Sequence, residues 1–483
     1  MANQSLLFDD LDSRCVQADF SGGHLSSDGG ALLLRQIDRG LGISRGLAAC
    51  FFDRRDPRYV EHPLECLIAQ RVQGLALGYE DLNDHNELRR DPLLAVCADK
   101  SDPLGLDRIH PQDKGKAMAS APTLNRMELG TEKNTRCHKI SATPEKIEQL
   151  LLTMGVRCLP RNLEEVILDL DAMGHILHGT QEGRFFSGYY GEYCYLPLYI
   201  FAGNIPLWAQ LRTADQDAAA GVLAALIQVV AALRKRFKDV RIIVRGDSGF
   251  ARPELMDWCE DNGVFYCLGL QRNERLEVLL QPALDSARAR FCLNGGVATR
   301  VFKEFQYATL KTWRCQRRVI GKARRRPAPG KAEITPEGEN PRFIVSNVIA
   351  KEFPQKDRCR MEPAPLYENL YCARGQMENV LKQQVLDLEA DRMSTHYMGS
   401  NQLRLWLSTF AYLLLERLRT LTLQGTELAS ATAGSIRLRL FKVAAIVRVS
   451  VRRVYVQMAS SFPMQALYAQ CLNRLKQINW QTG

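Results

Sequence analysis

Between residues 163 and 270, apolar and β-branched runs alternate with amphipathic runs, and this order limits the folds that the chain can adopt. Strands are predicted over 163–173, 189–201, 206–212, 240–247 and 264–270. Helices are predicted over 215–237, with acids in the first turn and cations in the last, and over 251–263, which ends in a glycine. Three successive strands followed by alternating helices and strands predict one mixed α/β sheet with helices on both faces.

This order of elements resembles the ribonuclease-H-like fold, in which one further long helix closes the domain. A helix of that kind is predicted over 366–388. Residues 271–355 come before it and contain short strand-like runs at 291–309, 317–321 and 342–348. We therefore expect a β-rich insertion ahead of the closing helix, with the charged run Lys322–Lys331 as one of its loops.

The regions on either side of this core are predicted to be mainly helical. Asp28 is placed to cap a helix that begins in the run GGALLL, and further helices are predicted over 62–79, 143–155 and 403–421. The expected divisions are 1–160 as a mainly helical region, 161–270 as the first part of the core, 271–355 as the β-rich insertion, 356–425 as the closing helices and 426–483 as a basic helical C-terminal region.

Cysteine usage and hydropathy exclude several classes of protein. The 14 cysteines occur singly, with no CxxC motif, which argues against a zinc ribbon and against a disulfide framework. No segment is long and apolar enough to span a membrane, and the N-terminus has no secretory pattern. We therefore expect a cytoplasmic protein with no membrane partner.

Positive charge is concentrated in two stretches that contain no acid. Lys311–Lys331 carries nine cations around Trp313, and Ser435–Val456 is a second basic run. Solvated loops or a basic helix face would explain either run alone. The two together, in a chain with a net charge of +10, favour a nucleic-acid partner.

Four acids occupy positions where this fold would bring carboxylates together. Asp169 and Asp171 lie two apart on the first strand, Asp247 directly follows the fourth strand, and Glu378 lies on the closing helix. Any one of them alone is more often a cap, a loop acid or half of a salt bridge. Because the first and fourth strands are neighbours in this fold, their combination predicts a site for hard divalent cations.

The helix that carries Glu378 places further polar side chains on the same face. Tyr371, Arg374, Glu378 and Lys382 recur at three- and four-residue spacing and form one stripe. One interpretation is an ion ladder on a solvated face. The other is a metal-binding carboxylate flanked by cations that hold phosphates, a role that suits the planar guanidinium of Arg374.

These motifs resemble the insertion-sequence transposases of the DDE class, in the group with a β-strand insertion before the final glutamate. The helix signature of that group is Tyr-x2-Arg-x3-Glu-x6-Lys, and Tyr371, Arg374 and Glu378 fit its spacing. Val385 stands at the signature lysine, and Lys382 lies one turn earlier. The usual Asp-x-Thr of the first strand aligns with residues 171–173, where Met173 replaces the threonine, and RGDSGF fits the segment of the second aspartate.

The resemblance implies cut-and-paste transposition: metal-dependent DNA cleavage at element ends, followed by strand transfer to target DNA. It implies two Mg²⁺ (or Mn²⁺) ions held by Asp171, Asp247 and Glu378, with Asp169 as the alternative first ligand. It implies terminal inverted repeats and target DNA as partners, with residues 1–160 binding the repeats. It also implies a homodimer on DNA, in a bacterial cytoplasm and associated with the nucleoid when bound. The predicted phosphate-binding residues are Tyr371, Arg374, Lys382, Arg245, Arg317, Arg318, Arg324, Arg325 and Arg326.

Two other functions remain open from the sequence. A ribonuclease-H-like nuclease would cut DNA without joining it. A transposase-derived DNA-binding protein would have lost catalysis, and the departures at Met173 and Val385 keep this reading open.

Overall fold

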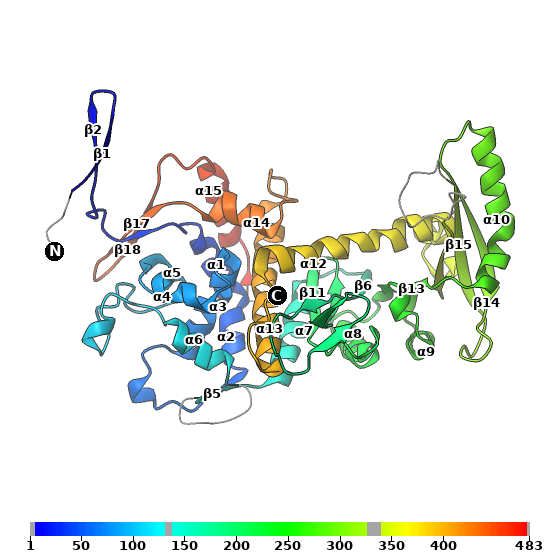
Figure 1. Cartoon of the computed structure of the whole chain (residues 1–483), viewed down its shortest axis with the longest axis horizontal. Helices are drawn as coiled ribbons and strands as arrows, with labels where there is room; N and C mark the ends of the chain where they lie inside the picture. The colour runs from blue at the N-terminus through cyan, green and yellow to red at the C-terminus, as the bar shows by residue number, and fades with distance from the viewer. Residues whose placement is uncertain (1–4, 131–137, 326–339, 481–483) are drawn as a thin grey trace. The chain divides into compact units, whose positions relative to one another are not determined.

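The chain folds into two compact units, which Figure 1 traces in colours that follow residue number. The computed structural model describes residues 5–130, 138–325 and 340–480. One unit consists of Met1–Leu150 with Gln383–Gly483, and the other of Leu151–Lys382. The sequence groups residues 356–425 with the core, whereas contacts place everything from Gln383 onward with the N-terminal region.

The second unit is built on a mixed sheet. Among its described residues, eight strands follow the order β11-β10-β6-β12-β13-β16-β15-β14. The five strands predicted for the core are β6 (Glu165–Ala172), β10 (Leu198–Ala202), β11 (Ile205–Gln210), β12 (Arg241–Gly246) and β13 (Phe265–Leu270). The first three pair antiparallel, and β12 and β13 continue from β6 in parallel. This strand order confirms the ribonuclease-H-like fold.

One helix connects β11 to β12, and a second connects β12 to β13. They are α8 (Val222–Arg236), which packs against β11, and α9 (Pro253–Asp261), which packs against β13. The prediction of acids in the first turn of α8 is wrong, because the helix begins after Gly221. Asp217 lies ahead of it and forms an ion pair with Arg252 at 2.5 Å instead. Gly221 has a φ of 74°, a left-handed conformation that glycine adopts at little cost.

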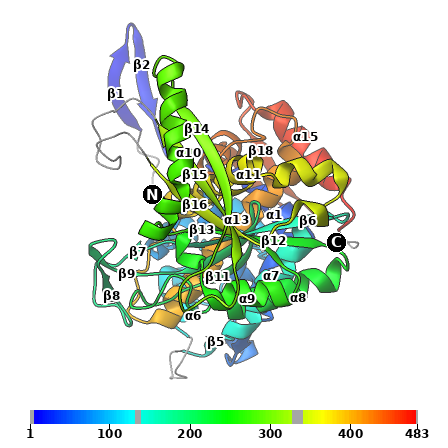
Figure 2. The same ribbon diagram turned by 90° about the vertical axis from the view of Figure 1, so that its right-hand side faces the viewer.

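The insertion differs from its prediction. Its strands, β14 (Thr299–Tyr307), β15 (Arg317–Arg325) and β16 (Arg342–Ser346), extend the main sheet through pairing of β16 with β13. A helix that the sequence did not predict, α10 (Glu274–Leu293), packs on β14 and β15 (Figure 2). Asn273 caps it, and Leu276, Leu280 and Leu284 are buried at helical spacing.

The charged run at Lys322–Lys331 is also corrected. Its first four residues belong to β15 and pair with β14, so they are not part of a loop. The remainder, from Arg326 onward, lies outside the described residues.

A second, smaller sheet is inserted between β6 and β10. It consists of β7 (His175–Ile176), β8 (Phe185–Ser187) and β9 (Glu192–Tyr195), in the order β7-β9-β8. The single strand predicted over 189–201 is therefore two strands, β9 and β10. Pro197 separates them, since proline has no N–H to donate to a ladder.

The segment predicted as one long closing helix is helical but changes its winding. It comprises α11 (Pro363–Pro365), a π-turn at Leu366–Tyr371, a 3-10 turn at Cys372–Arg374 and α12 (Gly375–Leu388). The change of winding occurs at the segment that holds Tyr371 and Arg374, and such irregular turns are frequent at functional sites.

The first unit is mainly helical around α13 (Met398–Leu418), which is almost wholly buried and packs against α1 (Ala31–Leu41) and α3 (Leu64–Leu77). Its remaining larger helices are α2 (Ile43–Ala48), α5 (Pro92–Cys97), α6 (Ala121–Glu128) and α15 (Gln465–Lys476). Helix α7 (Pro144–Cys158) runs past the end predicted at Gly155. Asp28 does not cap α1: Gly30 holds that position, and the buried Asp28 accepts hydrogen bonds from Tyr79 and Lys442.

Strands also occur where the sequence predicts helix. The described ones in this unit are β1 (Leu6–Leu11), β2 (Arg14–Ala18), β3 (Leu25–Ser26), β4 (Phe51–Asp53), β5 (Ile140–Ala142), β17 (Ala445–Val449) and β18 (Val454–Met458). The basic run Ser435–Val456 is helical as far as Phe441 and then forms a β-hairpin, so the region predicted as helical contains both kinds of element. Buried Val447 beside exposed Arg448 has the period of two expected for a strand. Among the described residues, no helix is long and apolar enough to cross a membrane.

Candidate active site

Asp171 and Asp247 lie at the ends of two neighbouring parallel strands. The register pairs Asp169 on β6 with Arg245 on β12, so each aspartate is two residues further along its own strand or just beyond it. The N–H of Ala172 donates to Oδ1 of Asp171 at 2.9 Å. Oδ1 of Asp247 accepts from the N–H of Gly249 at 2.8 Å, which holds the carboxylate at the strand end.

Arg374 connects the first aspartate to the closing helix. Its Nη1 lies 3.6 Å from Oδ2 of Asp171, and its Nη2 lies 3.0 Å from Oε1 of Glu378. One guanidinium therefore bridges two of the three predicted carboxylates. Lys382, one turn after Glu378, is exposed.

The carboxylates influence one another electrostatically. Burial raises the pKa of Asp171 to about 6; the Arg374 guanidinium opposes this rise, while Asp247 and Glu378 add to it. Three acids near one another in a partly buried site favour the binding of added positive charge. Arg374 supplies part of that charge in the protein alone.

The absence of a side chain at Gly269 on β13 leaves room for Tyr371 beside Asp247. A Cβ atom at Gly269 would lie 2.6 Å from the Tyr371 hydroxyl and 2.8 Å from the N–H nitrogen of Ser248. Burial raises the pKa of Tyr371 to about 12, so its hydroxyl remains a hydrogen-bond donor at neutral pH. Sequence reasoning missed Gly269, although a glycine inside a strand is a recognised sign of close approach by another group.

Arg245 and Asp169 form a buried ion pair. Nε and Nη2 of Arg245 donate to the two carboxylate oxygens of Asp169 at 2.5 and 2.8 Å, and both residues are buried. Nη1 of Arg245 donates to the carbonyl of Leu370 at 2.6 Å. The prediction of Arg245 as a DNA contact is corrected, because its guanidinium is enclosed. Asp169 has its carboxylate occupied, which favours Asp171 as the first candidate ligand.

A family model described as Transposase DDE domain group 1 matches residues 8–480. The chain belongs to this family of DDE transposases. Among solved structures it is similar to a piggyBac transposase in a synaptic complex with hairpin DNA, with 12% identity, a TM-score of 0.38, and coverage of 85% of this chain and 79% of that one. Comparison with curated proteins gives no match.

The insertion arginines of this transposase divide into two groups. Arg317 is buried in ion pairs with Asp257 and Glu260. Arg318 donates to the carbonyls of Val348 and Met361 and pairs with Glu304. Both hold the fold together, so their prediction as DNA contacts is corrected.

For the remaining arginines of the run, contact with DNA stays a prediction. Arg324 and Arg325 are partly exposed on β15, and the guanidinium of Arg325 lies over the ring of Phe291. Arg326 lies outside the described residues.

The transposase site suits hard cations by the chemistry of its donors. Asp171, Asp247 and Glu378 offer oxygen ligands, the type that Mg²⁺ and Mn²⁺ prefer. In the described parts of the chain, no three His, Cys, Asp or Glu side chains are already gathered closely enough to hold an ion. The bridging position of Arg374 is consistent with this, because the guanidinium stands between two of the candidate ligands.

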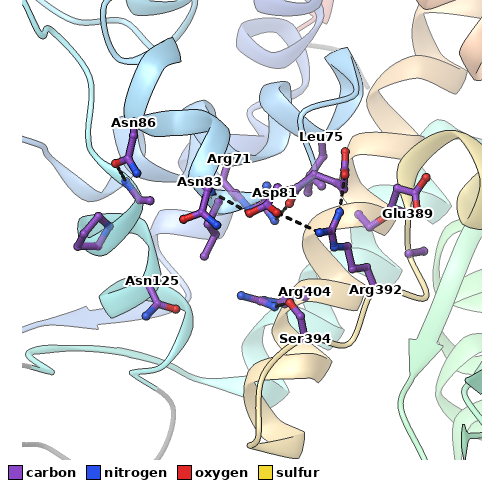
Figure 3. Close-up of a pocket in the computed structure, with 16 residues that line it drawn as sticks. Arg71, Leu75, Asp81, Asn83, Asn86, Asn125, Glu389, Arg392, Ser394 and Arg404 are labelled. Carbon is purple, nitrogen blue, oxygen red and sulfur yellow. Dashed lines mark hydrogen bonds and ion pairs between the residues drawn. The ribbon is translucent and has the colours of Figure 1, made fainter. Parts of the chain in front are cut away.

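A separate pocket of about 500 Å³ lies in the first unit (Figure 3). Its cations are paired with acids: Arg392 contacts Glu80 at 2.5 Å and Asp81 at 3.0 Å, and Arg404 contacts Glu128 at 2.6 Å. Because these charges neutralise one another, the pocket is a poor match for phosphate and is not included in the candidate active site.

Proposed function

We propose that this transposase cleaves DNA at the ends of a mobile element and joins the freed 3′-hydroxyl to target DNA. One observation supports this most strongly: Arg374 bridges Asp171 and Glu378 beside Asp247, in the positions of the fold where the family's carboxylates are expected. The proposed ligands of the ions are Asp171, Asp247 and Glu378. Bound Mg²⁺ or Mn²⁺, most simply two ions, would neutralise charge on the phosphate and activate the attacking oxygen.

The chain's own residues would orient the DNA strand. The planar guanidinium of Arg374 can release a carboxylate and bind the scissile phosphate in its place, through two parallel hydrogen bonds. The Tyr371 hydroxyl, held beside Asp247, can donate to a neighbouring phosphate oxygen, and Lys382 is exposed on the same helix. These three side chains would therefore hold the backbone across the carboxylates.

The proposed partners are terminal inverted repeats and a target duplex, bound by a homodimer on DNA. The helical N-terminal region is the proposed reader of the repeats. Partly exposed Arg324 and Arg325 are proposed to follow the DNA backbone along the insertion.

A strand-transfer assay tests this function. The full chain is incubated with Mg²⁺, a supercoiled target plasmid and a labelled duplex. The duplex has the sequence of the DNA that flanks the coding region of this transposase. Transposition predicts labelled target DNA, whereas a nuclease predicts cleaved donor without joined product. A family member that has lost catalysis would bind the duplex and leave it intact.

A further inference from the structure

The small sheet beside the active site exposes an unusual number of aromatic rings. Phe185, Phe186, Tyr189, Tyr190 and Tyr193 are 42, 58, 89, 37 and 44% exposed. All lie on β8, on β9 or in the turn that joins them. Phe186 and Tyr193 are paired across the two strands and share one face of the sheet, whereas Phe185 lies on the opposite face. Several exposed rings on one small sheet mark an interaction site more often than a single exposed side chain does.

The rings are arranged as two contacting pairs with one cation. Phe186 and Tyr193 meet edge to face with centroids 5.6 Å apart, and Tyr189 and Tyr190 do so at 4.9 Å. The guanidinium of Arg184 lies 4.7 Å from the centre of the Tyr193 ring. Ring faces and a guanidinium plane together suit a planar π-system as ligand.

This sheet is anchored directly to the strand end that carries the first candidate ligand. The hydroxyl of Tyr190 accepts a hydrogen bond from the N–H of Gly174 at 3.0 Å, three residues after Asp171. A Cβ at Gly174 would lie 2.6–2.8 Å from the Tyr190 ring, so the ring packs directly against the backbone of Gly174. Tyr190 is thus held against the backbone that follows Asp171.

We propose that the rings of the β7-β9-β8 sheet stack on unpaired nucleobases of the DNA strand whose phosphate lies at Asp171. The proposal deepens the proposed function and rests on it. A phosphodiester inside a duplex is flanked by stacked bases, and opening it toward a protein site requires those bases to find other stacking partners.

Bases fit this surface better than the sugar–phosphate backbone does. Glu192 is exposed on β9 and would repel phosphates, whereas base faces carry no net charge. Every base presents a π-face, so such stacking tolerates any sequence. The site would therefore hold the opened strand and leave recognition of the repeats to other regions.

Matched double variants of the full chain separate stacking from simple hydrophobic contact. Phe186→Leu with Tyr189→Leu keeps apolar surface but removes both rings, while Phe186→Tyr with Tyr189→Phe keeps the rings. Leu310→Ala removes an equally exposed apolar side chain elsewhere in the unit. Fluorescence anisotropy in EDTA measures binding of a labelled mixed-sequence 20-nucleotide single strand and of its blunt duplex, so no cleavage is required.

The leucine variant should bind the single strand at least about tenfold more weakly and the duplex within about twofold of wild type. The ring-preserving variant and Leu310→Ala should match wild type. Equal single-strand binding by all four proteins would overturn the proposal. So would loss of self-association in the leucine variant without loss of single-strand binding, which would assign the face to a second copy of the chain. Because these measurements need no catalysis, they stand apart from failure in the strand-transfer assay.

Discussion

Arg245 and Asp169 form a buried, bidentate ion pair that links the two strands carrying Asp171 and Asp247. The same guanidinium donates to the carbonyl of Leu370, next to Tyr371. Three elements of the candidate site are therefore fixed to one another by a side chain that does not reach solvent. Such support holds functional side chains in position before any ligand binds.

Replacing Arg245 with methionine should destabilise the protein strongly. The change leaves the carboxylate of Asp169 buried without a partner, a situation that costs about 3–5 kcal/mol. Urea denaturation followed by tryptophan fluorescence measures the loss.

The double variant Arg245→Met with Asp169→Leu removes both charges and serves as the control. It should recover at least half of that loss, because no unpaired charge remains. A single Arg245→Met variant within about 0.5 kcal/mol of wild type would show that the pair does not support the site.

The core strands and the positions of the acids were predictable from the sequence. Their apolar runs have the length and β-branched content of buried strands, and Asp247 follows such a run directly. The pairing of Asp169 with Arg245 was not predictable, because it depends on the register between β6 and β12. Composition gives no register for parallel strands that are distant in the chain.

Asp171 should make stability depend on pH. Its pKa in the folded chain is about 6, above the ordinary value of 3.8, so the fold favours the protonated form. This contribution to stability is fully present below pH 3.8 and is lost as the pH rises through 6. Asp171→Asn should therefore gain stability relative to wild type by on the order of 2 kcal/mol between pH 4.5 and pH 8.

Thermal unfolding over that pH range, without divalent cations, provides the measurement. Asp285→Asn, at an exposed acid on α10, is measured alongside as the matched control for removing one carboxylate. A constant difference between Asp171→Asn and wild type at every pH would contradict the electrostatic description of the site.

Arg317 and Arg324 should behave differently although both lie on β15. Arg317→Ala removes a buried partner of Asp257 and Glu260 and should cost about 2–4 kcal/mol of stability. Arg324→Ala should leave stability nearly unchanged. It should also shallow the salt dependence of duplex binding by about 0.9 in the log–log slope.

Dissociation constants at several salt concentrations, together with urea melts, test both statements. An unchanged slope for Arg324→Ala would remove this part of β15 from the DNA-binding surface. Arg317→Ala with normal stability would restore Arg317 as a candidate DNA contact.

The insertion shows why charge runs alone did not distinguish these roles. Lys311–Lys331 contains no acid, but Asp257 and Glu260 on α9 and Glu304 on β14 reach its arginines in the folded chain. Likewise, α10 has a cap and helical apolar spacing in its sequence, but Pro282 lies inside it and made a helix difficult to predict.

Metal choice should follow from the donor atoms. Mg²⁺ or Mn²⁺ should support cleavage, since the three candidate ligands offer oxygen alone. A zinc-selective chelator added in excess Mg²⁺ should leave the cleavage rate unchanged. Loss of activity under that treatment would require a zinc site that the candidate carboxylates do not provide.

The most direct measurement compares DNA cleavage and DNA binding by isosteric variants of the acids. Asp171→Asn, Asp247→Asn and Glu378→Gln each keep the side chain's shape and remove a charged metal ligand. The assay contains Mg²⁺ and the DNA that flanks the coding region of this transposase. The cleavage rate of each variant should fall at least about a thousandfold, while its dissociation constant for the duplex stays within about threefold of the wild-type value. Asp169→Asn, assayed well below its unfolding temperature, should retain cleavage. Cleavage that survives in Asp171→Asn and disappears in Asp169→Asn would contradict the proposed triad.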